Sequence, residues 1–359
     1  MSTFFVLLIL FFGFLITFQI AKASEYVGVL KGEKKNFEQN NRVNGFLMMA
    51  FLVLGLIGIY WCNELYRGKI LGESASKHGE QIDTMLYITI AITGVVFVLT
   101  QILLFWFAYK YQYSEKRKAH YFPHDNRLEV IWTVVPAIAL TVLVGFGLFY
   151  WFRITGEAPQ DANQVEITGK QFGWIFRYPG KDKTFGKKYY QNISDKDNNS
   201  LGLIWDDINT HDDVVVGNEM YCEVDKPLKL IINSRDVIHD VGLVYFRQKM
   251  DAVPGTPTTL WFVPKFTTEE MKKKLSNPDF EYEISCDQMC GRGHYTMRGI
   301  VKVVTHQEYV LWLAKQQTNY AQVFPDKNPA GPAAPAKTDT VKTAAVTPAP
   351  AATASVATK

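Results

Sequence analysis

Four stretches of the chain contain no Asp, Glu, Lys or Arg, and they limit the possible folds more than any other feature. They cover residues 3–21, 46–62, 85–109 and 130–152. A helix needs about 20 apolar residues to cross the hydrocarbon core of a bilayer, and the third and fourth stretches are clearly long enough. The second is short, but Tyr60 and Trp61 at its end are typical of a membrane interface. The sequence therefore predicts four transmembrane helices.

The basic residues between these stretches predict the topology. Residues 110–127 carry five Lys and Arg, so the positive-inside rule assigns this loop to the cytoplasm and everything after Arg153 to the outside. Counting back, the linker 22–45, also with five basic residues, is cytoplasmic. The "AKAS" at 21–24 resembles a signal-peptide cleavage site, but no basic residue precedes the first apolar stretch. We therefore expect a retained first helix with its N-terminus outside.

Beyond Gln160 the pattern changes to short runs that are typical of β-strands and separated by turn residues. No βαβ rhythm links these runs, so we expect an antiparallel sandwich or a Greek-key barrel. Two short helices are predicted over 267–275 and 306–317. The expected strands cover residues 164–168, 174–178, 227–233, 258–263, 280–285 and 299–304.

Four parts are predicted along the chain. They are an N-terminal region with two extra membrane helices (1–80), a transmembrane hairpin (81–155), an exported β domain (156–327) and a Pro-, Ala- and Thr-rich tail (328–359). The tail has almost no large apolar residue and is expected to be disordered. Residues 181–212 are polar and are interpreted as a surface insertion. A net charge of +3 without a basic run gives no indication of nucleic-acid binding.

Residues 286–297, "CDQMCGRGHYTM", hold two of the four cysteines in the chain. Gly291 and Gly293 argue against a helix, so we expect a loop between the last two strands. Two thiolates, an imidazole and a thioether are soft to borderline ligands, and the thioether favours copper over zinc. These four candidate ligands are Cys286, Cys290, His294 and Met297.

A second imidazole is predicted at His239, at a turn after the strand 227–233. Two bridging thiolates with one imidazole per metal suit a dinuclear copper centre for electron transfer. Three alternatives remain open on these residues alone: a zinc site of two Cys and two His, a thiol–disulfide relay, and a copper-delivery or assembly protein. The remaining cysteines, Cys62 and Cys222, are interpreted as small buried apolar residues.

Several motifs, in the right order over roughly residues 80–320, resemble subunit II of the haem–copper cytochrome c oxidases. The loop resembles the family's dinuclear copper (CuA) motif, C-x-E-x-C-G-x-x-H-x-x-M. "LEVIWTVVPAIAL" (128–140) resembles the start of its second membrane helix, and "KQFGWIFRY" (170–178) its aromatic electron-entry stretch. "SRDVIH" (234–239) and "KMDAVPG" (249–255) resemble the segments that carry and follow the first copper histidine.

The resemblance implies a membrane-anchored chain with a two-helix hairpin, here preceded by two extra helices, and an all-β cupredoxin-like Greek-key barrel outside the membrane. It implies a CuA centre with two bridging thiolates, two terminal imidazoles and two weak ligands, one of them a backbone carbonyl. The copper ligands would be Cys286 and Cys290, His239 and His294, Met297, and the carbonyl of Gln288.

The implied function is electron transfer within a proton-translocating cytochrome c oxidase of the bacterial inner membrane, with the copper domain on the periplasmic or outer face. Electrons would pass from a cytochrome c, or a cytochrome c domain, to the copper centre and on to haem in subunit I, which reduces oxygen to water. Subunit III is a further implied partner. Glu129 corresponds to a residue at the cytoplasmic entrance of a proton pathway, and Asp236 to one at the surface around the copper histidine.

Three departures from the family pattern affect these expectations. Gln288 replaces a glutamate whose side chain binds magnesium at the boundary with subunit I, which makes that site doubtful because Mg²⁺ prefers carboxylate. Phe172 replaces the donor-facing tryptophan, while the second tryptophan remains as Trp174, so these two residues and Asp236 are the electron-entry candidates. The extra helices within 1–80 are expected to anchor additional subunits or a partner respiratory complex.

Overall fold

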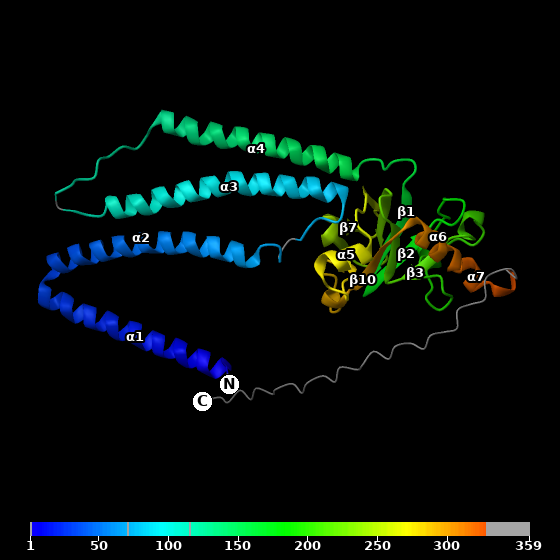
Figure 1. Ribbon diagram of the computed structural model, residues 1–359, viewed down its shortest axis with the longest axis horizontal. Coiled ribbons are helices and arrows are strands. Elements are labelled where there is room, and N and C mark those ends of the chain that lie inside the picture. Colours follow the sequence, from blue (N-terminus) through cyan, green and yellow to red (C-terminus); the bar gives the residue numbers. More distant parts are fainter. Residues whose placement is uncertain (1, 70–71, 115, 328–359) are drawn as a thin grey trace. The chain divides into compact units, whose positions relative to one another are not determined.

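The computed structural model describes residues 2–69, 72–114 and 116–327, and the predicted tail at 328–359 lies outside them (Figure 1). Four helices precede the β-strands, and each is long and apolar enough to cross a membrane. This confirms the four predicted apolar helices. They are α1 (Ser2–Lys31), α2 (Glu33–Tyr66), α3 (Lys77–Lys110) and α4 (Asn126–Thr155).

The helices extend beyond the charge-free stretches because capping residues and backbone breaks, not charges, end them. α1 and α2 continue through the predicted linker 22–45 and are separated by Gly32, whose φ of 81° is left-handed. The Ser76 hydroxyl accepts a hydrogen bond from the Gly79 amide at the start of α3. At the start of α4, the Asp125 carboxylate accepts from the amides of Arg127 and Leu128.

The first compact unit comprises Met1–Phe176 and Gly217–His306 and contains the four helices and most of the β-strands. In one sheet, the neighbouring strands β2, β1, β5 and β8 follow one another in this order, and the other sheet has the order β4-β10-β9-β6-β7. The bounds are β1 (Asn163–Lys170), β2 (Gly173–Tyr178), β4 (Glu219–Glu223), β5 (Leu228–Ser234), β6 (His239–Leu243), β7 (Gln248–Ala252), β8 (Thr258–Phe262), β9 (Tyr282–Cys286) and β10 (Arg298–Val304).

Apolar side chains from both sheets form the core of this β domain. Ile167, Leu230 and Phe262 come from the first sheet and Val241 and Ile284 from the second, and all are fully buried. The alternating burial along β5 and β9 is what their sequence pattern predicts. The domain is a cupredoxin-like β-barrel, as expected.

Two strand pairs differ from one of the two expected arrangements. β1 pairs with β5 and β10 pairs with β4 in parallel, whereas a purely antiparallel arrangement was one of the two expected. Parallel partners must be joined by long connections, and their pairing leaves no local signal in the sequence. The six predicted strands are confirmed, and the short strands β4, β6 and β7 were missed because their runs of five residues mix charged and apolar side chains.

The interpretation of the two isolated cysteines is correct for one of them. Cys222 lies in β4 and is buried. Cys62 is exposed near the end of α2, since no other described segment covers that face of the helix. Its apolar sequence surroundings reflect a helix suited to lipid, not a protein core.

The second compact unit joins Arg177–Val216 to the described residues that follow Gln307. Residues 181–212 were predicted to be a polar surface insertion, but Leu201 and Leu203 within them are buried. The Arg177 guanidinium binds the Asp213 carboxylate, and burial raises the pKa of Asp213 to about 6 despite this cation. The unit contains β3 (Val214–Gly217), α6 (His306–Lys315), which ends two residues before the predicted 306–317 helix, and the unpredicted α7 (Asn319–Val323). α5 (Thr268–Leu275) in the first unit begins at a Thr267 capping box and confirms the other predicted helix.

The segment that leads into α3 is hydrogen-bonded to the β domain. The Ala75 amide donates to the Tyr245 carbonyl (2.8 Å) and the Ser76 hydroxyl to the Phe246 carbonyl (2.7 Å). The Arg247 guanidinium donates to the Asp83 carboxylate (2.8 Å) and the Gly72 carbonyl (2.5 Å). The start of α3 and the β domain therefore lie on the same side of the membrane, in agreement with the predicted hairpin.

Arg247→Met should lower the free energy of unfolding of the β domain by about 3 kcal/mol, because it leaves the largely buried Asp83 carboxylate without its cation. The measurement is thermal unfolding of the full chain in detergent, followed by the circular dichroism of the β domain. Lys77→Met is the matched control, since Lys77 and Asp225 form an exposed ion pair worth less than about 1 kcal/mol. Equal effects of the two variants would contradict an anchoring role for Arg247.

Candidate metal centre

The pairing of two strands distant in sequence creates the site. In the antiparallel pair of β6 and β9, Val241 lies opposite Cys286 and Gly242 opposite Ser285. His239 is the first residue of β6 and Cys286 the last of β9. The register therefore places the predicted imidazole beside the first predicted thiolate, although a turn had been expected at His239.

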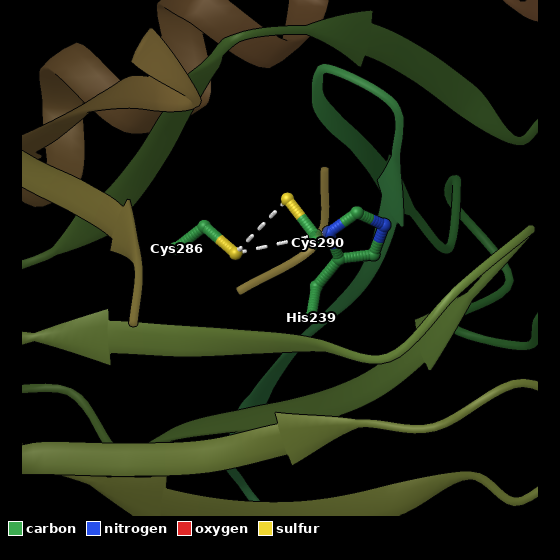
Figure 2. Close-up of side chains that lie close together, drawn as sticks. All are labelled: His239, Cys286 and Cys290. Carbon is green, nitrogen blue, oxygen red and sulfur yellow. Dashed lines mark hydrogen bonds between the residues drawn. The ribbon is translucent and has the colours of Figure 1, made fainter. Parts of the chain in front are cut away.

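The four strongest candidate ligands follow one another in space as imidazole, thiol, thiol and imidazole. Cys286 Sγ lies 3.7 Å from His239 Nδ1 and 3.7 Å from Cys290 Sγ, and these three side chains point toward one another (Figure 2). Cys290 Sγ lies 3.8 Å from His294 Nδ1. His239, Cys286 and Cys290 all have their ligand atoms within 4.8 Å of one another, and His294 is not a member of this group.

Two weaker candidate ligands complete the set, one beside each sulfur. The Gln288 carbonyl oxygen lies 3.1 Å from Cys286 Sγ. Met297 Sδ lies 3.9 Å from Cys290 Sγ and is buried. The structure thus brings together all six residues that were predicted as ligands, and this mixed nitrogen, sulfur and carbonyl set fits copper.

Close contacts of glycines hold the ligand loop and the His239 ring in place. A Cβ atom on Gly169 would lie 2.8 Å from the His239 ring, so this position has no room for a side chain. A Cβ on Gly293 would lie 2.5 Å from the Phe172 ring, which packs directly on the ligand loop. Gly291 has a φ of 136°, a conformation that other residues rarely adopt.

Asp236 orients the buried imidazole of His239. Its carboxylate lies 2.8 Å from His239 Nε2, which leaves Nδ1 facing the thiols. Partial burial alone would raise the pKa of Asp236, but hydrogen bonds from the Gln171 amide, the His239 ring and the Val237 amide hold that pKa below its usual range. Such a carboxylate fixes the tautomer of a ligating histidine and strengthens it as a ligand.

Gln171 connects the two halves of the site and was not singled out from the sequence. Its backbone amide donates to Asp236 (2.7 Å), and its side-chain amide donates to the Cys290 carbonyl (2.6 Å). One residue of the β1–β2 turn therefore ties the His239 side to the ligand loop. Its place beside Phe172 was the only signal in the sequence, because no residue pattern predicts a hydrogen bond to a backbone carbonyl.

The metal-free Cys290 thiol is protonated at neutral pH. Burial, with the hydrogen bond and charge of the neighbouring Cys286, raises the pKa of the Cys290 thiol to about 11. Metal binding must therefore displace protons from the site, as it does wherever thiolates are the ligands.

The remaining candidate residues occupy different positions. Trp174 is buried and packs edge-on against His239, with ring centroids 6.1 Å apart. Phe172 is 43% exposed and lies between the ligand loop and solvent. Glu129 lies in the first turn of α4, 3.9 Å from His124, and the structure does not bring it near the ligands. Of the electron-entry candidates, Phe172 and Asp236 are therefore accessible and Trp174 is not.

Asp236→Ala should weaken copper binding by about 10- to 100-fold, because the His239 ring loses the carboxylate that orients it. Asp236→Asn keeps an oxygen acceptor and should therefore lose less copper affinity than Asp236→Ala. Competition with a copper chelator measures both affinities in the full chain. Unchanged affinity in both variants would exclude an orienting role for Asp236.

The family models and the curated relatives that match this chain all describe subunit II of cytochrome c oxidase. The transmembrane domain of cytochrome c oxidase subunit II matches residues 65–149, and its periplasmic domain matches residues 164–304. The alternative cytochrome c oxidase subunit 2 of Bradyrhizobium diazoefficiens is 35% identical over 238 residues, which cover 66% of this chain and 80% of the relative. Cytochrome c oxidase subunit 2 of Cereibacter sphaeroides is 24% identical over 247 residues, covering 67% and 77%.

Among solved structures, the periplasmic domain of subunit II of cytochrome oxidase of Bradyrhizobium japonicum is 25% identical. It aligns with a TM-score of 0.30 and covers 44% of this chain and 94% of that chain. The domain with the candidate metal centre is thus the copper domain of a membrane-anchored oxidase subunit and lies outside the membrane. The chain belongs to the cytochrome c oxidase subunit II family.

Proposed function

We propose that this subunit holds a dinuclear copper centre and carries electrons from a cytochrome c type donor to haem in the catalytic subunit, which reduces oxygen to water. Two copper ions held by the two cysteines and the other ligands would supply a one-electron carrier. The proposed ligands are His239, Cys286, the Gln288 carbonyl, Cys290, His294 and Met297.

The spatial order of the ligand atoms is the observation that carries this proposal. A single tetrahedral zinc ion lies about 2.0–2.3 Å from each of its nitrogen and sulfur ligands, so all four must surround one point. Here each imidazole lies beside a different sulfur, and His294 stands outside the group formed by the other three. This order supports two metal positions that share the thiolates.

The alternatives explain fewer of the side chains. A thiol–disulfide relay needs the two cysteines but neither imidazole, nor Met297. A copper-delivery protein needs a thiol pair but does not need ligands that close around both sulfurs. The buried Met297 and the carboxylate-bound His239 support a permanent site with no position left open for a substrate.

Phe172 is the proposed point of electron entry. Its ring packs on Gly293 and is partly exposed, and the preceding Gln171 donates a hydrogen bond to the Cys290 carbonyl. A donor in contact with Phe172 would thus be linked to a ligand cysteine through the Phe172 ring, the adjoining Gln171 and its hydrogen bond to the Cys290 carbonyl. Trp174, buried against His239, is assigned to packing behind the ligand.

The assembly around this subunit is part of the proposal. Subunits I and III are the proposed membrane partners, and α1 and α2 are the proposed contact for additional subunits or a partner respiratory complex. The membrane is proposed to be the bacterial inner membrane, with the copper domain in the periplasm. Glu129, at the opposite end of α4 from the β domain, is the candidate entrance of a proton pathway, as its place at the start of a membrane helix suggests.

Electron paramagnetic resonance of the copper-loaded full chain tests the centre. One electron shared by two copper nuclei gives a multi-line hyperfine pattern, and Cys290→Ser should convert it to a four-line pattern because one bridging thiolate is lost. Gln288→Ala is the control, since it keeps the backbone carbonyl and should leave the pattern nearly unchanged. A four-line spectrum from the unaltered chain, or tight zinc binding without a copper signal, would refute the proposal.

A second experiment concerns the magnesium site. Gln288 offers a neutral amide, and the adjacent Asp287 carboxylate accepts from Ser285 and lies 3.9 Å from Lys249. We expect the purified oxidase to bind Mn²⁺, used as a paramagnetic substitute for Mg²⁺, only weakly, and Gln288→Glu to increase its affinity about tenfold or more because hard cations prefer carboxylate. Gln288→Met is the matched control without a carboxylate. Equal Mn²⁺ binding in all three proteins would disprove a role for this side chain.

A further inference from the structure

Apolar side chains are exposed in all three segments that surround the candidate centre. Phe172 is 43% exposed, Ile238 45% and Tyr295 81%, and Val237 beside Ile238 is 37% exposed. Ile238 directly precedes His239, and Tyr295 directly follows His294. These four residues are called the entry patch below.

Contacts between the segments keep the entry patch together. The Gln171 amide binds Asp236, so the turn that carries Phe172 lies beside the segment that carries Val237 and Ile238. The Phe172 ring packs against Gly293, two residues before Tyr295. The patch is thus one surface over the ligand loop, because the Gln171–Phe172 turn contacts the segments on both of its sides.

Acidic side chains around the entry patch already have partners. Asp236 accepts hydrogen bonds from the Gln171 amide, the Val237 amide and the His239 ring. Glu283 lies 3.6 Å from Arg298, whose guanidinium also lies over the Tyr295 ring. The charge of Glu283 is therefore paired with a cation, whereas Asp236 uses its acceptor atoms within the subunit and keeps one negative charge.

Two cations next to the patch have no such compensation. Arg292 is exposed between Gly291 and Gly293, and it forms no ion pair with any residue in the described parts of the chain. Lys170, two residues before Phe172, also has no carboxylate partner among residues 2–69, 72–114 and 116–327. Two unpaired cations, Arg292 and Lys170, thus stand against the single carboxylate of Asp236, so the net charge that the rim of the patch presents to a partner is positive.

We propose that the entry patch docks a haem protein whose contact face is apolar around the haem edge and acidic at its rim, not one surrounded by lysines. This rests on the proposed function and adds the chemistry of the donor. The apolar centre excludes water between Phe172 and the donor, while Arg292 and Lys170 select acidic partners and repel basic ones.

Binding of two forms of one cytochrome tests this inference. The probes are a basic c-type cytochrome with lysines around its haem edge and the same cytochrome after succinylation, which replaces each positive charge by a negative one. The purified oxidase, immobilised in nanodiscs, should associate at least about tenfold faster with the succinylated form at low ionic strength. The advantage should shrink as salt is added.

Single variants distinguish the contribution of the charges to donor binding from that of the apolar contact. Arg292→Glu should reduce the preference for the succinylated form severalfold, and Ile238→Ser should speed the dissociation of both forms. Lys273→Glu is the matched charge control: α5 contacts β10 through Thr268 and Val303, at the opposite end of that strand from the ligand loop. Its binding should equal that of the unaltered oxidase.

Faster association of the basic form, or equal association of both forms with no effect of Arg292→Glu, would overturn the inference. The proposed function would survive this result if the oxidase still gives the multi-line copper signal. Loss of that signal from the unaltered oxidase would instead refute the copper centre itself, so the two failures are distinguishable.

Discussion

The register between β6 and β9 is the constraint on which the rest of the site depends. Val241 opposite Cys286 fixes His239 beside the first thiol, and the ligand loop that follows β9 can then close only over this point. A shift of one residue would turn His239 to the other face of the sheet and leave the thiols without their first imidazole. The buried side chains on both sides of this pair, Val241 and Ile284 among them, hold the register, so the barrel core and the metal centre are stabilised by the same contacts.

Around the ligands, hydrogen bonds fix the orientation of the groups, which packing alone does not determine. Packing excludes water from His239 and Met297, but only directional bonds decide which ring nitrogen faces the sulfurs and where the loop carbonyls point. Asp236 and Gln171 provide this direction from the surface of the domain, where a donor protein would also arrive. The site is thus rigid where the ligands are and accessible at one ring, Phe172, which suits a centre that exchanges electrons but no atoms.

Sequence reasoning predicted the features that have local causes. The four apolar helices, six strands and α5 follow from hydrophobic period, length and caps, and four of the six candidate ligands follow from the soft side chains of one loop. His239 was predicted from a separate segment, and the Gln288 carbonyl only from the family resemblance. The parallel pairs, the strand that starts at His239 and the hydrogen bonds of Gln171 depend on segments that are far apart in the chain. Cys62 was misjudged for a related reason: an apolar neighbourhood in sequence indicates burial in water-soluble folds, but not in a helix that has lipid as its solvent.

Position 288 shows how one residue can serve two sites independently. Its carbonyl direction is set by the loop backbone between Cys286 and Cys290, so any side chain there leaves the oxygen 3.1 Å from Cys286 Sγ. The side chain is exposed on the domain surface. Its chemistry would therefore affect only the binding of an adjoining subunit or a hard cation. Replacing a carboxylate by an amide at this position therefore removes a negative charge from the interface without disturbing the ligand loop. Together with the unpaired cations at Lys170 and Arg292, the neutral Gln288 lowers the negative charge of the surface around the centre. Under the proposed function, this charge would act both on a cation beside the centre and on the approach of the donor.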